Sequence, residues 1–305
     1  MFDIVIIGAG PAGLSAAIHA KRFDLNCVVL ERGTVGGQAL SARWIENYPG
    51  FPNGITGRDL MGLFVKQAEE VGVRIEKCEV SRVSLRGATT NVGATKQSPE
   101  SNCVQGIASR PKVARNDNVY ELVTSGGVVE ANSIILATGL EPIRLPLPLG
   151  ERAGGEGVLY YPDPNEVPHE GKNVVVIGGG DSAFDEALSF SKKAAHVTIA
   201  MRSDKPKAWD ELIRQAKDAD IEIMAGLSEE CIAKLKADIT IACCGKWQNL
   251  NILDEPLRMT SLPVASHQPL ATLQLAGDIA HPNIRHIAAA VGDGVTAVEE
   301  ISRGV

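Results

Sequence analysis

The sequence contains no apolar run close to the ~20 residues that a helix needs to cross a bilayer, so no membrane span is expected. It also lacks a basic excess: 37 Asp and Glu outnumber 30 Lys and Arg, which gives a net charge of −7. A general nucleic-acid binder needs a basic face, so the composition argues against that class. The first residues, MFDIVIIGAG, already have a strand pattern and leave no room for a signal peptide. We expect a cytoplasmic protein with neither a membrane nor a nucleic acid as partner.

The cysteines include no C-x-x-C pair. The six are Cys27, Cys78, Cys103, Cys231, Cys243 and Cys244. Their separations do not match the closely spaced ligands of a zinc site, so no metal is expected. Cys243 and Cys244 are adjacent, but they end a strand-like pattern in which successive side chains point to opposite faces. We expect packed, reduced thiols there rather than a disulfide.

A glycine-rich motif follows the first apolar run. Ile4–Ile7 predicts a buried parallel strand, and Gly8, Gly10 and Gly13 follow it in G-x-G-x-x-G spacing before an Ala-rich helix. This arrangement brings free N–H groups and the positive end of the helix dipole to a pyrophosphate. Glu31 ends the next strand pattern, at the distance where an acidic residue binds a ribose hydroxyl pair. The motif in this context predicts a dinucleotide site.

The same pattern occurs a second time. Asn173–Ile177 predicts another buried strand, and Gly178, Gly180 and Ala183 follow it before a second helix. Two nucleotide folds in one chain of 305 residues suggest a flavin in one and a nicotinamide in the other, because no third region is large enough for a separate catalytic domain.

The second copy differs from the first in its charge. The acidic residue that corresponds to Glu31 is absent, and Arg202 stands beside its place. A carboxylate there would repel a 2′-phosphate, while Arg202 would attract one, and Ser203 and Lys207 could complete the pocket. A solvated surface charge is the alternative for Arg202. We expect NADPH rather than NADH in this site.

The motifs, taken together and in order, resemble those of the low-molecular-weight thioredoxin reductases, a branch of the pyridine nucleotide-disulfide oxidoreductase superfamily. The segments that carry the resemblance are GAGPAGLSAA, VGGQ, ENYPGFPNGITGRDLM, ILATG, VVVIGGGDSAFDEA and LAGDIA. It implies an α/β protein with two Rossmann-like, three-layer ββα domains, the NADP(H) domain being inserted into the FAD domain. The FAD domain would comprise residues 1–145 and 246–305, and the NAD(P)H domain residues 146–245. A homodimer is also implied.

The resemblance assigns cofactor-binding roles residue by residue. The residues expected around FAD are Gly8, Gly10, Pro11, Ala12, Gly13, Glu31, Arg32, Gly37, Gln38, Asn47, Val80, Gly139, Gly277, Asp278, His286 and Ile287. Those expected around NADPH are Gly178, Gly180, Asp181, Ser182, Ala183, Arg202 and Lys207. The final helix, which follows His286, would direct its N-terminus at the flavin and stabilise negative charge there. The family usually has glutamine at the place of His286, which could donate to the flavin or serve only as a capping or surface residue.

The chain departs from the family at the redox dithiol. Tyr161 and Pro164 stand where the family has its two cysteines, and neither can supply the thiolate that attacks a disulfide. Tyr160 or Tyr161 could instead stack near the flavin ring, a contact worth ~1 kcal/mol, or Tyr161 could simply fill space at a domain junction. A second departure is the polar segment 87–118, which predicts a long loop, with partner docking as the alternative.

These observations predict an FAD-dependent NAD(P)H oxidoreductase that passes electrons from NADPH through FAD to an acceptor other than thioredoxin. The acceptor could be a small molecule, oxygen, or a carrier protein such as ferredoxin. Three alternatives stay open: a ferredoxin or flavodoxin–NADP reductase of thioredoxin-reductase type, a flavin-binding redox sensor with negligible turnover, and a thioredoxin-disulfide reductase that uses non-standard cysteines.

Overall fold

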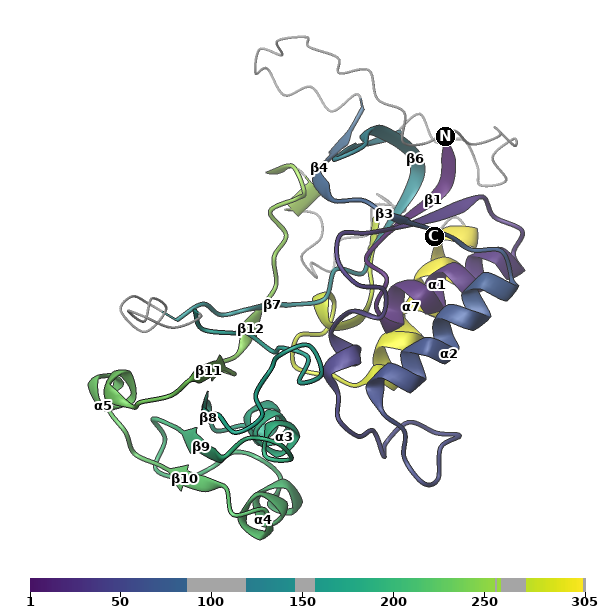
Figure 1. Ribbon diagram of the computed structural model, residues 1–305. Coiled ribbons are helices and arrows are strands. Elements are labelled where there is room, and N and C mark those ends of the chain that lie inside the picture. The colour runs from purple at the N-terminus through teal and green to yellow at the C-terminus, as the bar shows by residue number, and fades with distance from the viewer. Residues whose placement is uncertain (87–118, 146–156, 256, 259–272, 304–305) are drawn as a thin grey trace. The chain divides into compact units, whose positions relative to one another are not determined.

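The computed structural model describes residues 1–86, 119–145, 157–255, 257–258 and 273–303 (Figure 1). The predicted loop at 87–118 lies outside them. The chain forms two compact units: unit 1 comprises residues 1–39, 46–140 and 248–305, and unit 2 comprises residues 40–45 and 141–247. The α/β fold class is as expected. The grouping of residues 40–45 with unit 2 was not anticipated.

Unit 1 is built on a mixed sheet with the strand order β3-β2-β1-β6-β5-β4, and β13 pairs with β6. β1 pairs in parallel with both β2 and β6, whereas β4, β5 and β6 form an antiparallel meander. All six residues of β1 are buried, which explains its uninterrupted apolar sequence. The strands are β1 (Phe2–Ile7), β2 (Cys27–Glu31), β3 (Arg74–Lys77), β4 (Val80–Leu85), β5 (Tyr120–Thr124), β6 (Gly127–Leu136) and β13 (Leu273–Leu275).

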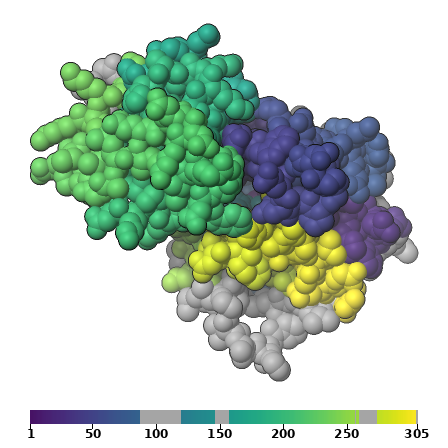
Figure 2. Space-filling model, turned by 90° about the horizontal axis from the view of Figure 1, so that it is seen from below, coloured from purple at the N-terminus to yellow at the C-terminus, as the bar shows by residue number. Residues whose placement is uncertain are grey.

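Helices α1 (Pro11–Arg22), α2 (Gly57–Glu70) and α7 (Ile287–Arg303) lie together on one face of this sheet (Figure 1). α7 packs closely on α1 at Gly294, where any β-carbon would collide with the carbonyl oxygen of Ala12. Thr56 caps α2 by accepting from the amide of Asp59 at 3.1 Å. Part of the C-terminal segment that includes α7 is exposed on the surface and is coloured yellow in Figure 2. Short 3₁₀ turns cover Gly37–Ser41 (η1) and Gly277–Ile279 (η2).

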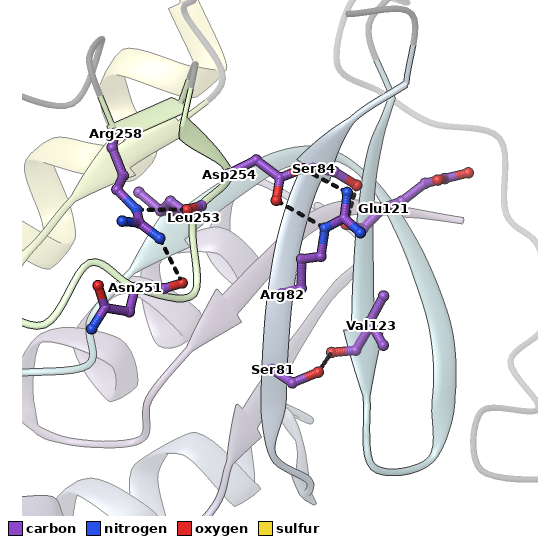
Figure 3. Close-up of polar contacts among 9 residues, drawn as sticks. All are labelled: Ser81, Arg82, Ser84, Glu121, Val123, Asn251, Leu253, Asp254 and Arg258. Atoms are coloured by element: carbon purple, nitrogen blue, oxygen red, sulfur yellow. Dashed lines mark hydrogen bonds and ion pairs between the residues drawn. The ribbon is translucent and has the colours of Figure 1, made fainter. Parts of the chain in front are cut away.

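The chain that returns from unit 2 is fastened to the free edge of β4. The amide of Val83 donates to the carbonyl of Ile252 at 2.6 Å, and the amide of Asp254 donates back to Val83 at 3.0 Å. Figure 3 shows the side chains over this edge: Arg82 donates twice to the carboxylate of Asp254, at 2.8 and 3.0 Å. Arg258 donates to the carbonyl of Leu253 at 2.8 Å. The segment 248–305 of unit 1 is thus tied to the segment 46–140 by backbone and side-chain bonds.

Unit 2 has a parallel sheet with the order β10-β9-β8-β11. Its strands are β8 (Asn173–Ile177), β9 (His196–Ala200), β10 (Glu222–Met224) and β11 (Ile239–Ala242), and its helices are α3 (Asp181–Phe190), α4 (Asp210–Asp218) and α5 (Glu229–Lys234). The core includes the fully buried rings of Phe184 and Phe190. Two short strands lie where the chain enters and leaves unit 2: β7 (Glu141–Pro142) and β12 (Lys246–Trp247). They pair with each other in antiparallel fashion. None of the described helices has the length and hydropathy of a membrane span.

Two candidate nucleotide sites

The loop between β1 and α1 is shaped by two glycines and open at a third. A β-carbon on Gly8, whose φ is +105°, would collide with the carbonyl oxygen of Ala137, and one on Gly13 would collide with the carbonyl oxygen of Gly8. A β-carbon on Gly10 would meet nothing within 4 Å. Gly10 is the N-cap of α1 and offers no capping side chain, and Pro11 follows it. The space beside Gly10, at the N-terminus of α1, is therefore open, which fits a pyrophosphate.

Glu31 lies directly beside this loop. Its carboxylate accepts from the amide of Ala9 at 2.7 Å and from the amide of Gly33 at 2.7 Å. These two bonds hold a negative charge next to the glycine loop, as ribose recognition requires. The carbonyl of Glu31 accepts from the amide of Cys78 at 2.8 Å. Val80, the first residue of β4, is two positions after Cys78. Arg32 is exposed at the end of β2.

Three further predicted residues converge on the same loop. A β-carbon on Gly37 would lie 3.4 Å from the Cα of Gly10. Gln38 donates through Nε2 to the carbonyl of Leu140, and a β-carbon on Gly139 would lie 3.5 Å from the same Nε2. Segments from three parts of the sequence thus meet around Gly10.

The C-terminal motif reaches α1 from the other side. A β-carbon on Gly277 would lie 2.9 Å from the Cβ of Ala12, and the amide of Gly277 donates to Asp293 at 3.1 Å. Asp278 follows in η2. His286 immediately precedes α7, which begins at Ile287, and its Nδ1 lies 3.4 Å from Nδ2 of Asn47. The structure therefore brings Gly37 against Gly10, Gly277 against Ala12, and Asn47 beside His286.

The loop between β8 and α3 repeats the construction of the first loop. A β-carbon on Gly178, whose φ is +149°, would lie 2.5 Å from the carbonyl oxygen of Cys243, whereas one on Gly180 would meet nothing within 4 Å. Asp181 accepts from the amide of Trp209 at 2.9 Å, and Ala183 is buried. Ser182 lies between them in the first turn of α3 and is partly exposed. This loop lies between β8 and β11, where the strand order reverses and where open α/β sheets bind ligands.

The predicted 2′-phosphate residues lie beside this second loop. A β-carbon on Gly179 would be 3.3 Å from the Oγ of Ser203, and the amide of Lys207 donates to the carbonyl of Gly179 at 2.7 Å. Arg202 is exposed, and its Nη1 donates to Oε1 of Glu229 at 2.9 Å. The sequence did not predict Glu229, because it is distant in the chain and belongs to no motif.

Tyr161, at one cysteine position of the family, and its neighbour Tyr160 each contact a cation within unit 2. Tyr161 has a φ of +51°, and Nζ of Lys246 lies 3.9 Å from its ring centroid. The hydroxyl of Tyr160 accepts from the amide of Leu145 at 2.9 Å, and the guanidinium of Arg144 lies 4.6 Å from the Tyr160 ring centroid. Cation–π contacts of this kind are worth roughly 0.5–2 kcal/mol. Stacking of either ring on a flavin stays a prediction.

The cysteines of the described residues are all free thiols. Burial raises the pKa of Cys243 well above its ordinary value, with a smaller contribution from the nearby Glu186. Burial also raises the pKa of Cys244, and it raises that of Cys27 to about 11. Because the thiolate is the nucleophile, these three thiols are poor candidates for disulfide chemistry.

Charged residues on α3, Asp185 and Glu186, were not indicated by any sequence motif. Glu186 is 6% exposed, and its Oε2 has no hydrogen-bond partner. Burial raises the pKa of Glu186 to about 8; the charge of Asp185 adds to this and Lys246 opposes it. Arg43 donates to Asp185 at 3.3 Å and to Gln215 at 3.1 Å, which fixes residues 40–45 in unit 2. The available signal was the helical period, since Glu186 follows buried Ala183 by three positions.

Two α/β units, each with a glycine loop open at a helix N-terminus, define a protein that binds two dinucleotides. Comparison with known proteins identifies which kind. The profile described as "Pyridine nucleotide-disulphide oxidoreductase" matches residues 5–222, and the chain belongs to this family. It is therefore an FAD-dependent NAD(P)H oxidoreductase of the thioredoxin reductase type, and its cofactors are FAD and NADPH, as expected from the sequence.

Relatives match over nearly the whole chain. A "34.2 kDa protein in rubredoxin operon" of Clostridium pasteurianum is 29% identical and covers 97% of this chain and 94% of its own. Thioredoxin reductase of Bacillus subtilis is 27% identical and covers 100% and 95%. The crystal structure of Lactococcus lactis thioredoxin reductase in its FR conformation superposes with a TM-score of 0.75 at 25% identity, covering 100% of this chain and 99% of that one. The two-domain Rossmann-like fold is thereby confirmed.

Proposed function

We propose that this protein passes electrons from NADPH through FAD to an acceptor other than thioredoxin, with FAD in unit 1 and NADPH in unit 2. The observation that carries the proposal is the replacement of the redox dithiol by Tyr161 and Pro164. The raised pKa values of Cys243 and Cys244 add support, because these neighbouring thiols are kept protonated.

Bound FAD would supply the two-electron redox chemistry that connects NADPH to the acceptor. The protein supplies binding and charge. The open side of Gly10 would hold the pyrophosphate, and Glu31 would accept from the ribose hydroxyls. The N-terminus of α7 would stabilise negative charge on the flavin. A homodimer is the assembly that we expect.

A ferredoxin or flavodoxin reductase is the second candidate. Exposed lysines on unit 2 favour it, since acidic carrier proteins need a positive surface: Lys192, Lys193, Lys205 and Lys207. A flavin-binding sensor with negligible turnover has no specific support, because a second nucleotide loop of complete geometry would serve no purpose in it.

The test is anaerobic reduction by NADPH followed by a panel of acceptors: thioredoxin, ferredoxin, a quinone and oxygen. We expect NADPH to bleach the flavin and thioredoxin to leave it bleached, while another acceptor restores the colour. Rapid reoxidation by thioredoxin would contradict the proposal, and it is the result that the relatives named thioredoxin reductases would suggest. A flavin that NADPH cannot bleach would favour the sensor.

A further inference from the structure

Arg202, the predicted ligand of a 2′-phosphate, is already paired with a carboxylate. Its Nη1 lies 2.9 Å from Oε1 of Glu229, and the two side chains are 70% and 58% exposed. Both are therefore accessible to a ligand. An incoming phosphate would have to share or replace this contact.

The backbone fixes the pair in place. The amide of Met201 donates to Met224 at 2.9 Å, and the amide of Leu227 donates to Met201 at 3.1 Å. The amide of Gly226 donates to the carbonyl of Ser203 at 3.0 Å. Residues 201–203, which include Arg202, therefore lie beside residues 224–227, which precede Glu229. Ser228 then caps α5 by accepting from the amide of Cys231 at 3.2 Å, and Glu229 is the first helical residue. The position of Glu229 opposite Arg202 follows from this register rather than from two flexible side chains alone.

The pair also lies at the second glycine loop. A β-carbon on Gly179 would be 3.2 Å from the Sδ of Met201 and 3.3 Å from the Oγ of Ser203, the two neighbours of Arg202. A residue near the end of the second strand of a dinucleotide fold meets the adenosine ribose, and Arg202 lies two positions after the end of β9. A 2′-phosphate there would be repelled by Glu229 and would compete with it for the guanidinium. A 2′-hydroxyl is neutral and can donate to a carboxylate.

We propose that Glu229 is a specificity-determining residue, which competes with the 2′-phosphate for Arg202 and so weakens the preference for NADPH over NADH. The inference rests on the proposed NADPH site in unit 2. Exposed ion pairs are weak, and repulsion between the carboxylate and the phosphate adds to the competition. Removing the charge of Glu229 should therefore tighten 2′-phosphate binding about threefold to tenfold at low ionic strength.

The test uses fragments that bind without turnover. Calorimetry on the FAD-loaded protein would give the affinities of adenosine 2′,5′-bisphosphate and of AMP for wild type, Glu229→Gln and Glu230→Gln. Glu230 is the matched control, because it is the next residue of α5, is exposed, and loses the same charge. We expect only Glu229→Gln to tighten the bisphosphate, with AMP unchanged. Equal effects of both variants would show a general charge effect and overturn the proposal, as would no effect of Glu229→Gln.

Arg202→Gln separates the possible failures. It should weaken the bisphosphate about tenfold, and in its background Glu229→Gln should gain less than it does alone. If Arg202→Gln has no effect, or wild type does not bind the bisphosphate, then the 2′-phosphate site itself is wrong and the proposal falls with it. If Arg202→Gln acts and Glu229→Gln does not, only the role of Glu229 is lost. Bleaching of the flavin by NADPH tests the proposed function independently of these results.

Discussion

Glu186 makes the stability of the folded protein depend on pH. In the unfolded chain its carboxyl ionises near the ordinary value, but in the fold burial raises the pKa to about 8. The folded protein therefore holds a proton that the unfolded chain has lost. Stability should fall with rising pH between these two values, by ~1.4 kcal/mol per unit for this one group, and level off above the higher one.

Glu186→Gln should remove this dependence, because the amide cannot ionise. Urea unfolding at several pH values between 5 and 9 would measure it, and we expect the variant to gain on wild type as the pH rises to about 8 and no further above that. The slope is compared rather than the absolute stability, since the amide brings its own polar group into a buried site. Identical slopes for the two proteins would show that Glu186 ionises normally in the fold.

Gly10 and Gly13 should respond differently to the same added methyl group. In Gly13→Ala the methyl would collide with the carbonyl of Gly8, so both folding and FAD binding should suffer. In Gly10→Ala it enters open space, so the FAD-free protein should melt like FAD-free wild type while FAD affinity falls at least tenfold. Melting curves and retained flavin absorbance separate the two. Full flavin retention by Gly10→Ala would mean that this open side does not hold the cofactor.

The residues that the sequence could predict are those whose roles are local. Gly8, Gly13 and Gly178 follow from the strand–turn–helix connection itself, and Glu31 from its distance along the chain. The partnership of Arg202 with Glu229 depends on how residues 224–227 run beside residues 201–203, which no local pattern encodes. The electrostatic environment of Glu186 likewise includes Lys246, which is distant in the sequence.

At the scale of elements, the contact between α1 and α7 offers a matched pair of glycines. In Gly294→Ala the methyl would collide with the carbonyl of Ala12, so we expect a loss of roughly 1–3 kcal/mol. In Gly292→Ala, two residues earlier on the same helix, the methyl meets nothing within 4 Å, and helix propensity predicts a gain of up to about 1 kcal/mol. Chemical unfolding measures both. Similar effects of the two substitutions would argue against the close approach of the helices.

Strands that are buried on both sides could be predicted almost to the residue. Asn173–Ile177 is β8 as expected, and Ile4–Ile7 lies within β1, because parallel strands require continuous apolar runs. The segment 40–45 carried no such signal, since its association with unit 2 rests on the side chain of Arg43. The pairing of β4 with residues 252–254 was equally hidden, because it joins segments that are far apart in the sequence.

At the scale of the whole molecule, we propose that the redox dithiol is the one group that electron transfer from NADPH to a disulfide still requires. The double variant Tyr161→Cys/Pro164→Cys would restore the cysteine spacing of the family. We expect it to gain NADPH-dependent reduction of thioredoxin, at least tenfold above wild type, because a thiolate and its resolving partner would again be present.

The matched control is Tyr161→Ser/Pro164→Ser, which removes the same rings and the contact with Lys246 but adds no thiol. Serine also experiences the same positive φ at position 161, so backbone strain is common to both variants. Activity confined to the cysteine variant would place the loss of thioredoxin reduction at these two residues. Substantial and equal NADPH-dependent reduction of thioredoxin by wild type and both variants would mean that electrons already leave by another thiol. The proposed function would then be wrong.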